Sequence, residues 1–406
     1  MKVLIVGSGG REHALAWKLS QSPSLESLHS APGNPGIAAL GECHPVRAED
    51  GEGLLSLCRE LGVDLVVVGP EAPLVAGVGD ELRHAGLAVF GPSAAAARIE
   101  GSKSFAKEVM AAAGVPTADT LAVARAPCVL KVDGLAAGKG VFVCHTREEL
   151  DRAMQAVAAF EGPIVIEELL EGEEVSVFAL VAGSTVVPLA PAQDFKRLED
   201  GDRGPNTGGM GAYSPVPALS DELAAEVAET VHRPVVEELA RRGTPFVGLL
   251  YAGLMLTADG LRVLEFNCRF GDPETQVVVP RLGTDLLEAI AAAAGGELAG
   301  VVPAARDEAA VTVVAAAATY PERGDAGTPI EGVDAAEAGG ALVFHAGTAI
   351  RDGALVTNGG RVLSVTGLGP TVGDARDRAY DALGRISFAG MRFRTDIAAE
   401  AARVRA

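Results

Sequence analysis

The segment around residue 265 carries three side chains whose types and spacing could do chemistry. Glu265, Asn267 and Arg269 alternate with apolar or small residues in the run LEFNCRFGDPE. If this run is a strand, residues two apart share a face, so the acid, the amide and the guanidinium point together. Carboxylate and amide oxygens suit Mg²⁺, which completes its shell with water and substrate phosphates, and a planar guanidinium suits a carboxylate or phosphate. Because buried charges without partners are costly, the pattern predicts a magnesium site beside an anion site.

A glycine-rich loop follows the first apolar run of the chain. Residues 3–6 are apolar and lead into GSGGREH at 7–13. Such a loop before a helix presents backbone N–H groups and the helix dipole to an anion. The dinucleotide fingerprint requires a third glycine at position 12, where this chain has Glu12. The loop therefore disfavours NAD and leaves two alternatives open, a phosphate-binding loop and a structural turn.

A second glycine-rich loop, KVDGLAAGKGV at 131–141, has lysines at both ends. It is not a Walker A loop, because three residues separate Gly134 from Gly138 and Gly140 follows Lys139. A hairpin loop of this composition could still fold over nucleotide phosphates. A solvated turn is an equally good interpretation of this loop alone.

An acidic run, EELLEGEE, occupies residues 167–174. A run of charges most often faces solvent. The functional alternative is a hinge whose backbone contacts adenine, with a later glutamate on the ribose hydroxyls.

The elements that would position these groups predict an α/β protein. Apolar runs at 3–6, 65–68 and 87–90 each end at glycine or Gly-Pro, with helical patterns between them, which is typical of a parallel sheet that binds ligands at its carboxyl edge. A helix is predicted over 100–113. Strands at 128–132, 141–144 and 164–167, with a helix over 146–160, predict a small lid.

The remaining pattern predicts a central body and a smaller C-terminal domain. Residues 175–189 read as a hairpin, and 196–212 as a long loop of the functional or mobile kind. A helix over 220–242 has Ser220 as its N-cap and a kink at Pro234. A second hairpin spans 246–266. Strands at 311–317, 341–346 and 362–366 belong to a C-terminal domain that shows no catalytic constellation, and we expect His345 to be structural.

Composition limits the class of protein. The 406 residues carry a formal charge of −20, which repels nucleic acid and anionic membranes. Five scattered cysteines without a C-x-x-C pair argue against a disulfide framework or a zinc site and for a reducing compartment. The start MKVLIVGSGG has no secretory pattern, and no long apolar span occurs. We expect a cytoplasmic protein.

Taken together, the motifs resemble those of the ATP-grasp ligases, and among them the phosphoribosylamine–glycine ligase family. The resemblance runs through GSGGREHA, GPEAPLVAG, GSKSFAK, KVDGLAAGKGV, EELLEGEEVS, DGDRGPNTGGMGAYSP and LEFNCRFGDPETQ. It implies an N-terminal domain over 1–100, an ATP-grasp body over 101–117 and 175–308, a mobile lid over 118–174 and a C-terminal α/β domain over 309–406.

The resemblance also implies roles for individual residues. Glu265 and Asn267 would bind Mg²⁺ or Mn²⁺, and Arg269, Asp194 and Lys139 would be catalytic, with the first two holding glycine or its acyl phosphate. The residues implied in ATP binding are Lys103, Lys131, Gly138, Gly140, Glu167, Glu168, Leu169 and Glu174. Those implied in binding phosphoribosylamine and glycine are Gly9, Gly10, Glu71, Gly208, Gly209, Met210, Gly211, Ala212, Arg269 and Asp272. The family commonly has histidine where this chain has Phe195, so no role is carried over to that position.

The implied reaction joins glycine to phosphoribosylamine at the expense of ATP, in a monomer or weak homodimer. Three alternatives remain open: a biotin-carboxylase-like ligase, a dinucleotide-dependent oxidoreductase, against which Glu12 argues, and a nucleotide sensor without turnover. The sensor leaves the shared face of Glu265, Asn267 and Arg269 unexplained.

Overall fold

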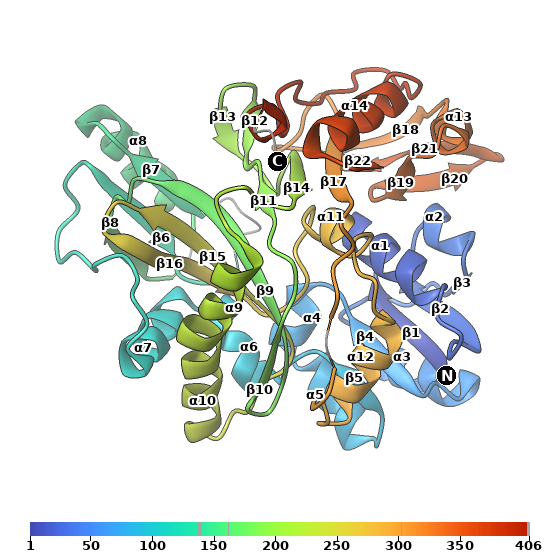
Figure 1. Ribbon diagram of the computed structural model, residues 1–406, viewed down its shortest axis with the longest axis horizontal. Helices are drawn as coiled ribbons and strands as arrows, with labels where there is room; N and C mark the ends of the chain where they lie inside the picture. The colour runs from blue at the N-terminus through green and yellow to red at the C-terminus, as the bar shows by residue number, and fades with distance from the viewer. Residues whose placement is uncertain (136–139, 161, 302, 404–406) are drawn as a thin grey trace.

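The computed structural model describes residues 1–135, 140–160, 162–301 and 303–403. Figure 1 shows the N-terminal sheet in blue, the segment predicted as a lid (called the lid below) in teal, the central body in green and yellow, and the C-terminal part in orange and red. Within the described residues, no helix is long and apolar enough to cross a membrane.

The N-terminal region is a five-stranded parallel sheet in the order β3-β2-β1-β4-β5. This confirms the parallel sheet predicted from the apolar runs, which are buried on both faces as such strands require. Its strands are β1 (Lys2–Gly7), β2 (Ser27–Pro32), β3 (Glu42–Cys43), β4 (Leu65–Val68) and β5 (Ala88–Phe90). Its helices are α1 (Gly10–Leu19), α2 (Pro35–Ala38), α3 (Gly51–Leu61), α4 (Glu71–Ala76) and α5 (Val78–His84).

The helix predicted over 100–113 is two helices, so that prediction was wrong at its start. Helix α6 (Ala94–Gly101) ends at Ser102, and α7 (Lys103–Ala113) begins after it. Ser102 has an extended backbone, and its hydroxyl accepts a hydrogen bond from the Phe105 N–H at 3.2 Å. Serine favours this capping geometry over a helix interior. The break places Lys103 in the first turn of α7.

The lid is a three-stranded antiparallel sheet with one helix and its own small core. Strand β6 (Cys128–Val132) lies between β7 (Val141–Cys144) and β8 (Ile164–Glu168), and α8 (Arg147–Val157) packs on them. Cys128 and Cys144 stand directly opposite each other on β6 and β7, and both are buried free thiols. The sequence spacing did not indicate this pairing.

The body is a four-stranded antiparallel sheet in the order β10-β9-β15-β16. Its strands are β9 (Glu173–Ala182), β10 (Thr185–Pro188), β15 (Val247–Thr257) and β16 (Gly260–Asn267). One continuous helical segment accompanies the sheet and consists of α9 (Asp221–Val227), a π-helical turn (Ala228–His232) and α10 (Arg233–Arg241). The Ser220 cap is confirmed by a hydrogen bond from Leu223 N–H at 3.3 Å. The irregularity predicted at Pro234 lies in the π-turn before it, where the chain accommodates the missing N–H and the ring clash of proline.

The segment 196–212 contains regular structure, so the prediction of a structureless loop was wrong. It holds the hairpin β12 (Arg197–Glu199) and β13 (Arg203–Asn206) and enters β14 (Gly211–Ser214). Strand β14 pairs with β17 (Ala309–Ala316) in a sheet of order β11-β14-β17-β22-β19. Body and C-terminal region therefore share one sheet, whose other members are β11 (Gln193–Asp194), β22 (Arg361–Gly369) and β19 (Leu342–His345).

The C-terminal region adds a second small sheet and a covering helix. Helix α14 (Val372–Leu383) packs on β22 and β17. The remaining elements are α11 (Thr275–Val278), α12 (Leu286–Ala294), β18 (Asp325–Pro329), α13 (Val333–Ala338), β20 (Thr348–Arg351), β21 (Ala354–Gly359) and a 3₁₀ turn (Ala401–Arg403).

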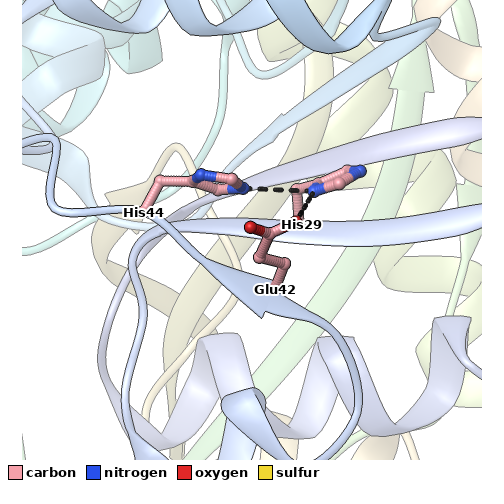
Figure 2. A group of neighbouring side chains, drawn as sticks. All are labelled: His29, Glu42 and His44. Carbon is pink, nitrogen blue, oxygen red and sulfur yellow. Dashed lines mark hydrogen bonds and ion pairs between the residues drawn. The ribbon is translucent and has the colours of Figure 1, made fainter.

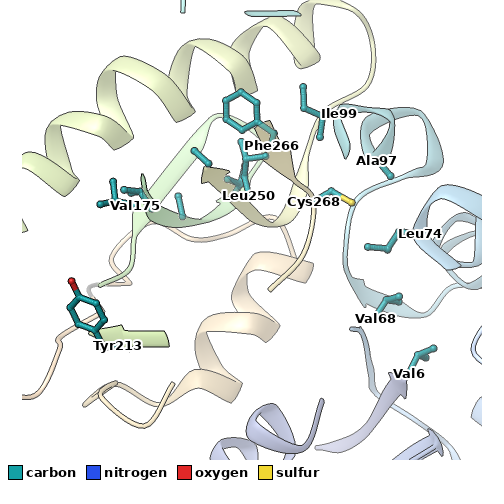
Figure 3. Close-up of a cluster of buried hydrophobic side chains, with 14 of the residues drawn as sticks. Val6, Val68, Leu74, Ala97, Ile99, Val175, Tyr213, Leu250, Phe266 and Cys268 are labelled. Atoms are coloured by element: carbon teal, nitrogen blue, oxygen red, sulfur yellow. The ribbon is translucent and has the colours of Figure 1, made fainter. Parts of the chain in front are cut away.

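One apolar core connects the N-terminal sheet to the body. Figure 3 shows Val6 and Val68 at one end, Leu74, Ile99 and Phe266 between, and Val175 and Tyr213 at the other end. These side chains are almost fully buried. The continuous packing holds β16 against α6, so the end of β16 has a fixed position relative to the N-terminal sheet.

Candidate functional site

A cavity of about 310 Å³ lies where the parts of the molecule meet. Arg11 and Glu71 reach it from the N-terminal region, Lys131 from the lid, Glu265 from the body and Arg361 from the C-terminal sheet. Its lining is dominated by charged side chains of both signs. A cavity of this kind suits a charged ligand assembled from several parts, because a site at the junction of domains can close around it.

The end of β16 supplies one wall of the cavity. Glu265, Asn267 and Arg269 all line it, as their spacing along a strand predicts. Strand β15 holds their register, since Gly253 stands opposite Glu265 and Tyr251 opposite Asn267. Within the described part of the chain, no hydrogen bond or ion pair engages the Glu265 carboxylate.

Arg269 is held by three side chains and by the carbonyl group of Phe270. Its Nε donates to Glu71 Oε2 at 3.1 Å, its Nη2 lies 2.8 Å from Glu100 Oε1 and also donates to Asn267 Oδ1 at 3.2 Å. Burial opposes the charge of Arg269, but Glu100 and Glu71 outweigh burial and raise its pKa. Burial likewise raises the pKa of Glu71, but Arg269 and Arg11 bring it down to about 2. The guanidinium is therefore a fixed, partly neutralised cation on the cavity wall.

Glu167 joins two lysines beneath the cavity. Its carboxylate oxygens lie 2.6 Å from Lys131 Nζ and 2.8 Å from Lys107 Nζ. Lys131 Nζ also donates to the Leu264 carbonyl at 2.8 Å, which ties the lid to β16. Glu167 is buried, so the solvated interpretation of the acidic run is wrong for this residue. The arrangement fixes the ammonium of Lys131 at the cavity surface.

Lys103 joins the start of α7 to the start of the second glycine-rich loop. Its Nζ donates to the Gly134 carbonyl at 2.8 Å, and its backbone N–H donates to Asp133 Oδ1 at 2.6 Å. Burial lowers the pKa of Lys103, although Glu265 and Asp133 oppose that shift. A cation so placed faces the same cavity as Lys131.

Lys196 also lies on the cavity wall, between two carboxylates. Its Nζ is 2.9 Å from Asp194 Oδ1 and also contacts Glu174 Oε1. Burial opposes the charge, but Asp194 and Glu174 outweigh it and hold the pKa of Lys196 well above its usual value. Burial raises the pKa of Glu174 despite Lys196.

Glu274 is a buried carboxyl group on the cavity wall. The Tyr251 hydroxyl lies 2.8 Å from Glu274 Oε1 and 2.8 Å from the Ser176 hydroxyl. Burial, and after it the charge of Asp194, raises the pKa of Glu274 to about 7. A carboxyl group with this pKa can both accept and release a proton near neutral pH.

Arg361 brings the C-terminal sheet into the cavity. Its Nη2 lies 3.1 Å from Asp272 Oδ2, and its Nη1 donates to the Asp272 carbonyl at 2.7 Å and to the Gly208 carbonyl. The sequence showed no catalytic constellation in the C-terminal domain, and Arg361 was not among the residues that the resemblance implied; the structure places it on the cavity wall.

Comparisons with known proteins identify the family. The phosphoribosylglycinamide synthetase profiles match residues 1–100 (N domain), 101–275 (ATP-grasp domain) and 310–400 (C domain). The chain is 56% identical to the phosphoribosylamine–glycine ligase of Streptomyces coelicolor, over 99% of this chain and 100% of that protein. The chain belongs to the phosphoribosylglycinamide synthetase family.

Solved structures agree with this assignment. The phosphoribosylamine–glycine ligase of Thermotoga maritima is 35% identical and superposes with a TM-score of 0.84, covering 98% of this chain and 100% of that one. The biotin carboxylase domain of a Hydrogenobacter thermophilus 2-oxoglutarate carboxylase shares only 18% identity at a TM-score of 0.71, covering 97% and 91%. The second likeness reflects the fold alone. Family membership makes ATP a substrate of this chain.

The structure of this phosphoribosylglycinamide synthetase family member brings many of the predicted residues to one cavity. The predicted residues on its wall are Glu71, Lys103, Lys131, Gly140, Glu167, Asp194, Gly208, Glu265, Asn267, Arg269 and Asp272. Gly138 and Lys139 lie outside the described residues.

The first glycine-rich loop does not line the cavity through Gly9 or Gly10. The Gly9 N–H donates to Glu12 Oε2 at 2.6 Å, so Glu12 occupies the position that an anion would take there. A Cβ at Gly10 would lie 2.7 Å from Gln276 Nε2. Both glycines are thus in close contact with neighbouring side chains, as the structural-turn alternative predicts, and their expected role toward phosphoribosylamine stays a prediction.

The segment after Gly208 turns into the protein interior. Met210 and Ala212 are fully buried, and a Cβ at Gly211 would lie 2.6 Å from the Thr312 carbonyl of β17. Gly209 has a φ of +106° and donates its N–H to Thr207 Oγ1 at 3.0 Å. These residues do not line the cavity; they hold Gly208 at its edge.

Three residues that were expected to contact the nucleotide also do not line the cavity. Glu168 accepts a hydrogen bond from the Asp119 N–H at 2.8 Å, and Glu174 is engaged by Lys196. Leu169 is half-buried just past the end of β8.

Sequence reasoning missed Lys107, Glu100, Lys196, Tyr251, Glu274 and Arg361, which all line the cavity. Glu274 had a signal, since it lies in the motif GDPET directly after the strand bearing Glu265. Lys196 lies two residues from its partner Asp194. The partners of Lys107, Glu100, Tyr251 and Arg361 come from more distant segments, and no local pattern marks them.

Proposed function

We propose that the chain catalyses the ATP-dependent joining of glycine to 5-phosphoribosylamine, giving glycinamide ribonucleotide, ADP and phosphate. The observation that carries the proposal is the meeting of Glu265 and Asn267 with the ammonium groups of Lys103 and Lys131 on one cavity. Acidic and amide oxygens beside fixed cations are what a magnesium nucleotide requires.

Glu265 and Asn267 would hold Mg²⁺ or Mn²⁺. The donor set fits, because the Glu265 carboxylate has no hydrogen bond or ion pair within the described residues, and Asn267 Oδ1 retains acceptor capacity beside its single bond from Arg269. When bound, the ion would neutralise the phosphate charge. Lys131, fixed by Glu167, and Lys103 would contact the phosphates, and the loop with Gly138, Lys139 and Gly140 would cover them. The backbone over 167–169 would face adenine and Glu174 the ribose.

The remaining walls suit the other two substrates. Asp194 and Glu274 would face the amino groups, and Arg269 the carboxylate of glycine or the acyl phosphate made from it. Arg361, with Gly208 and Asp272 beside it, would face the phosphate of phosphoribosylamine, because a guanidinium binds phosphate through paired hydrogen bonds. Glu71 would orient Arg269.

The chemistry then needs no enzyme nucleophile. A carboxylate oxygen of glycine attacks the γ-phosphorus, and the bond to ADP breaks, which gives glycyl phosphate. The amine of phosphoribosylamine attacks the acyl carbon, phosphate leaves, and the amine proton passes to Glu274. Positioning and fixed charge supply most of the acceleration, and closure of the lid would keep water from the acyl phosphate.

A coupled assay of ADP release tests this proposal. Release should require glycine and phosphoribosylamine together. Release that depends on bicarbonate and biotin would favour a carboxylase-like ligase, and ATP binding without turnover would favour a sensor. A thermal-shift comparison of NAD with ATP should show stabilisation by ATP alone.

We also propose a cellular compartment and an oligomeric state for this chain. We place it in the cytoplasm, in keeping with five free cysteines, and expect a monomer or weak homodimer. Sedimentation at several concentrations would test the oligomeric state.

A further inference from the structure

We infer that His29, Glu42 and His44 form a binding site for a transition-metal dication of the Zn²⁺ class at the edge of the N-terminal sheet. His29 lies on β2, directly opposite Glu42 on β3, and His44 follows that strand. Figure 2 shows both imidazoles and the carboxylate turned toward one another. None of the three lines the cavity described above.

The distances fit one small ion. His29 Nδ1 lies 3.1 Å from His44 Nε2 and 3.9 Å from Glu42 Oε2. One ligand atom from each residue lies within 4.8 Å of the others. Tetrahedral Zn²⁺, with bonds of about 2.0–2.2 Å, places its ligand atoms roughly 3.4 Å apart. A turn of the exposed Glu42 side chain would bring its carboxylate onto the same ion as the two imidazoles and leave a fourth position for water.

Ser27 orients His29 for this task. The Ser27 hydroxyl lies 3.0 Å from His29 Nε2. If that nitrogen carries the proton and donates it to Ser27, the lone pair of Nδ1 points at His44 and Glu42. Hydrogen bonding of the outer ring nitrogen is how metal-binding histidines are commonly fixed. The neutral tautomer with its proton on Nε2 is the form that a metal ligand must take.

Two histidines and one carboxylate select the kind of ion. Imidazole nitrogen suits Zn²⁺, Cu²⁺ and Ni²⁺, whereas Mg²⁺ prefers oxygen. The site should therefore discriminate against the ion proposed at Glu265. An ion here would cross-link β2 to β3, which is two residues long and forms the edge of the sheet. We assign the site a stabilising role.

Zn²⁺ titration of the full chain by calorimetry, in excess Mg²⁺ and a non-thiol reductant, tests the inference. Wild type should bind one equivalent and gain thermal stability with Zn²⁺. His44→Gln and Glu42→Gln should weaken that binding at least about tenfold, whereas His84→Gln, an exposed histidine on α5, should not. Ser27→Ala should still bind one equivalent of Zn²⁺, but with reduced affinity.

Co²⁺ provides an independent readout. Wild type should show the intense visible absorption of low-coordinate Co²⁺, and His44→Gln should lose it with an unchanged far-ultraviolet circular dichroism spectrum. Equal Zn²⁺ affinity and stoichiometry in wild type and His44→Gln would overturn the inference. So would the absence of any Zn²⁺ equivalent in wild type, which would make the His29–His44 contact an ordinary hydrogen bond.

Discussion

The guanidinium of Arg361 lies 3.1 Å from the carboxylate of Asp272. One residue comes from β22 and the other from the turn after β16, so the C-terminal sheet reaches the end of the strand that carries Glu265. The same guanidinium donates to the carbonyl groups of Gly208 and Asp272. The C-terminal region thus contributes a half-buried cation to the cavity.

Replacing Arg361 with alanine should selectively weaken the binding of phosphoribosylamine. Hydrogen bonds to charged groups contribute about 1.5–3 kcal/mol, so KM for phosphoribosylamine should rise about 10- to 100-fold while KM for ATP stays close to wild type. Steady-state kinetics with each substrate varied would measure this. Arg351→Ala removes an exposed arginine from the same region and is the control. An unchanged KM in Arg361→Ala, or an equal rise for ATP, would contradict the assignment.

Glu167→Gln should weaken both folding and ATP binding. The variant leaves the ammonium groups of Lys131 and Lys107 without their shared anion, and breaking a buried ion pair costs about 3–5 kcal/mol. Urea unfolding would measure the loss, and a calorimetric titration would measure ATP affinity. Glu168→Gln is the matched control, because that half-buried carboxylate accepts from the Asp119 N–H and should cost about 1 kcal/mol. Equal losses in the two variants would argue against the paired-lysine arrangement.

Glu274 should make the stability of the fold depend on pH. Its pKa is about 7 in the folded chain, above the value of 4.5 for an unperturbed glutamate, so the folded state holds the proton longer. Its favourable contribution is complete below about pH 4.5 and is lost as pH rises through 7. The loss should be on the order of 1–3 kcal/mol. Urea midpoints between pH 5 and 8 should fall less in Glu274→Gln than in wild type; parallel curves would refute this.

The ionisation of Glu274 should also determine how the reaction rate depends on pH. If Glu274 accepts the amine proton, kcat/KM for phosphoribosylamine should rise with pH around an apparent pKa near 7. Glu274→Gln should lower the rate and lose that limb of the profile. A wild-type limb that persists in the variant would assign the proton to another group.

The strands, and the side chains that share a face on one of them, could be predicted because local sequence patterns determine them. Continuous apolar runs ending at glycine indicated the parallel sheet, and the two-residue spacing put Glu265 and Asn267 on one wall. Family motifs supplied the proposed reaction. Local preference could also have corrected the helix predicted over 100–113. Serine tends to cap helices, and the Ser102 cap divides α6 from α7.

The rest depends on contacts between distant segments. The acidic run at 167 looked like a solvated surface because its partner Lys107 lies 60 residues away in the chain and is brought to it only by folding. Arg361 meets Asp272 across 89 positions. The pKa of Glu274 follows from burial, which no motif encodes. The first glycine-rich loop shows the converse, because its Gly9 N–H, which the pattern offers to an anion, donates to the chain's own Glu12.

The most direct test of the account is glycine-dependent ADP release by Glu265→Ala across a Mg²⁺ titration. Loss of the proposed metal ligand should lower kcat/KM at least about 100-fold, with the fold intact by circular dichroism. Asp259→Ala, in the exposed turn of the same hairpin, should behave as wild type. Wild-type activity with undiminished Mg²⁺ dependence in Glu265→Ala would contradict the central claim that the end of β16 holds the metal nucleotide.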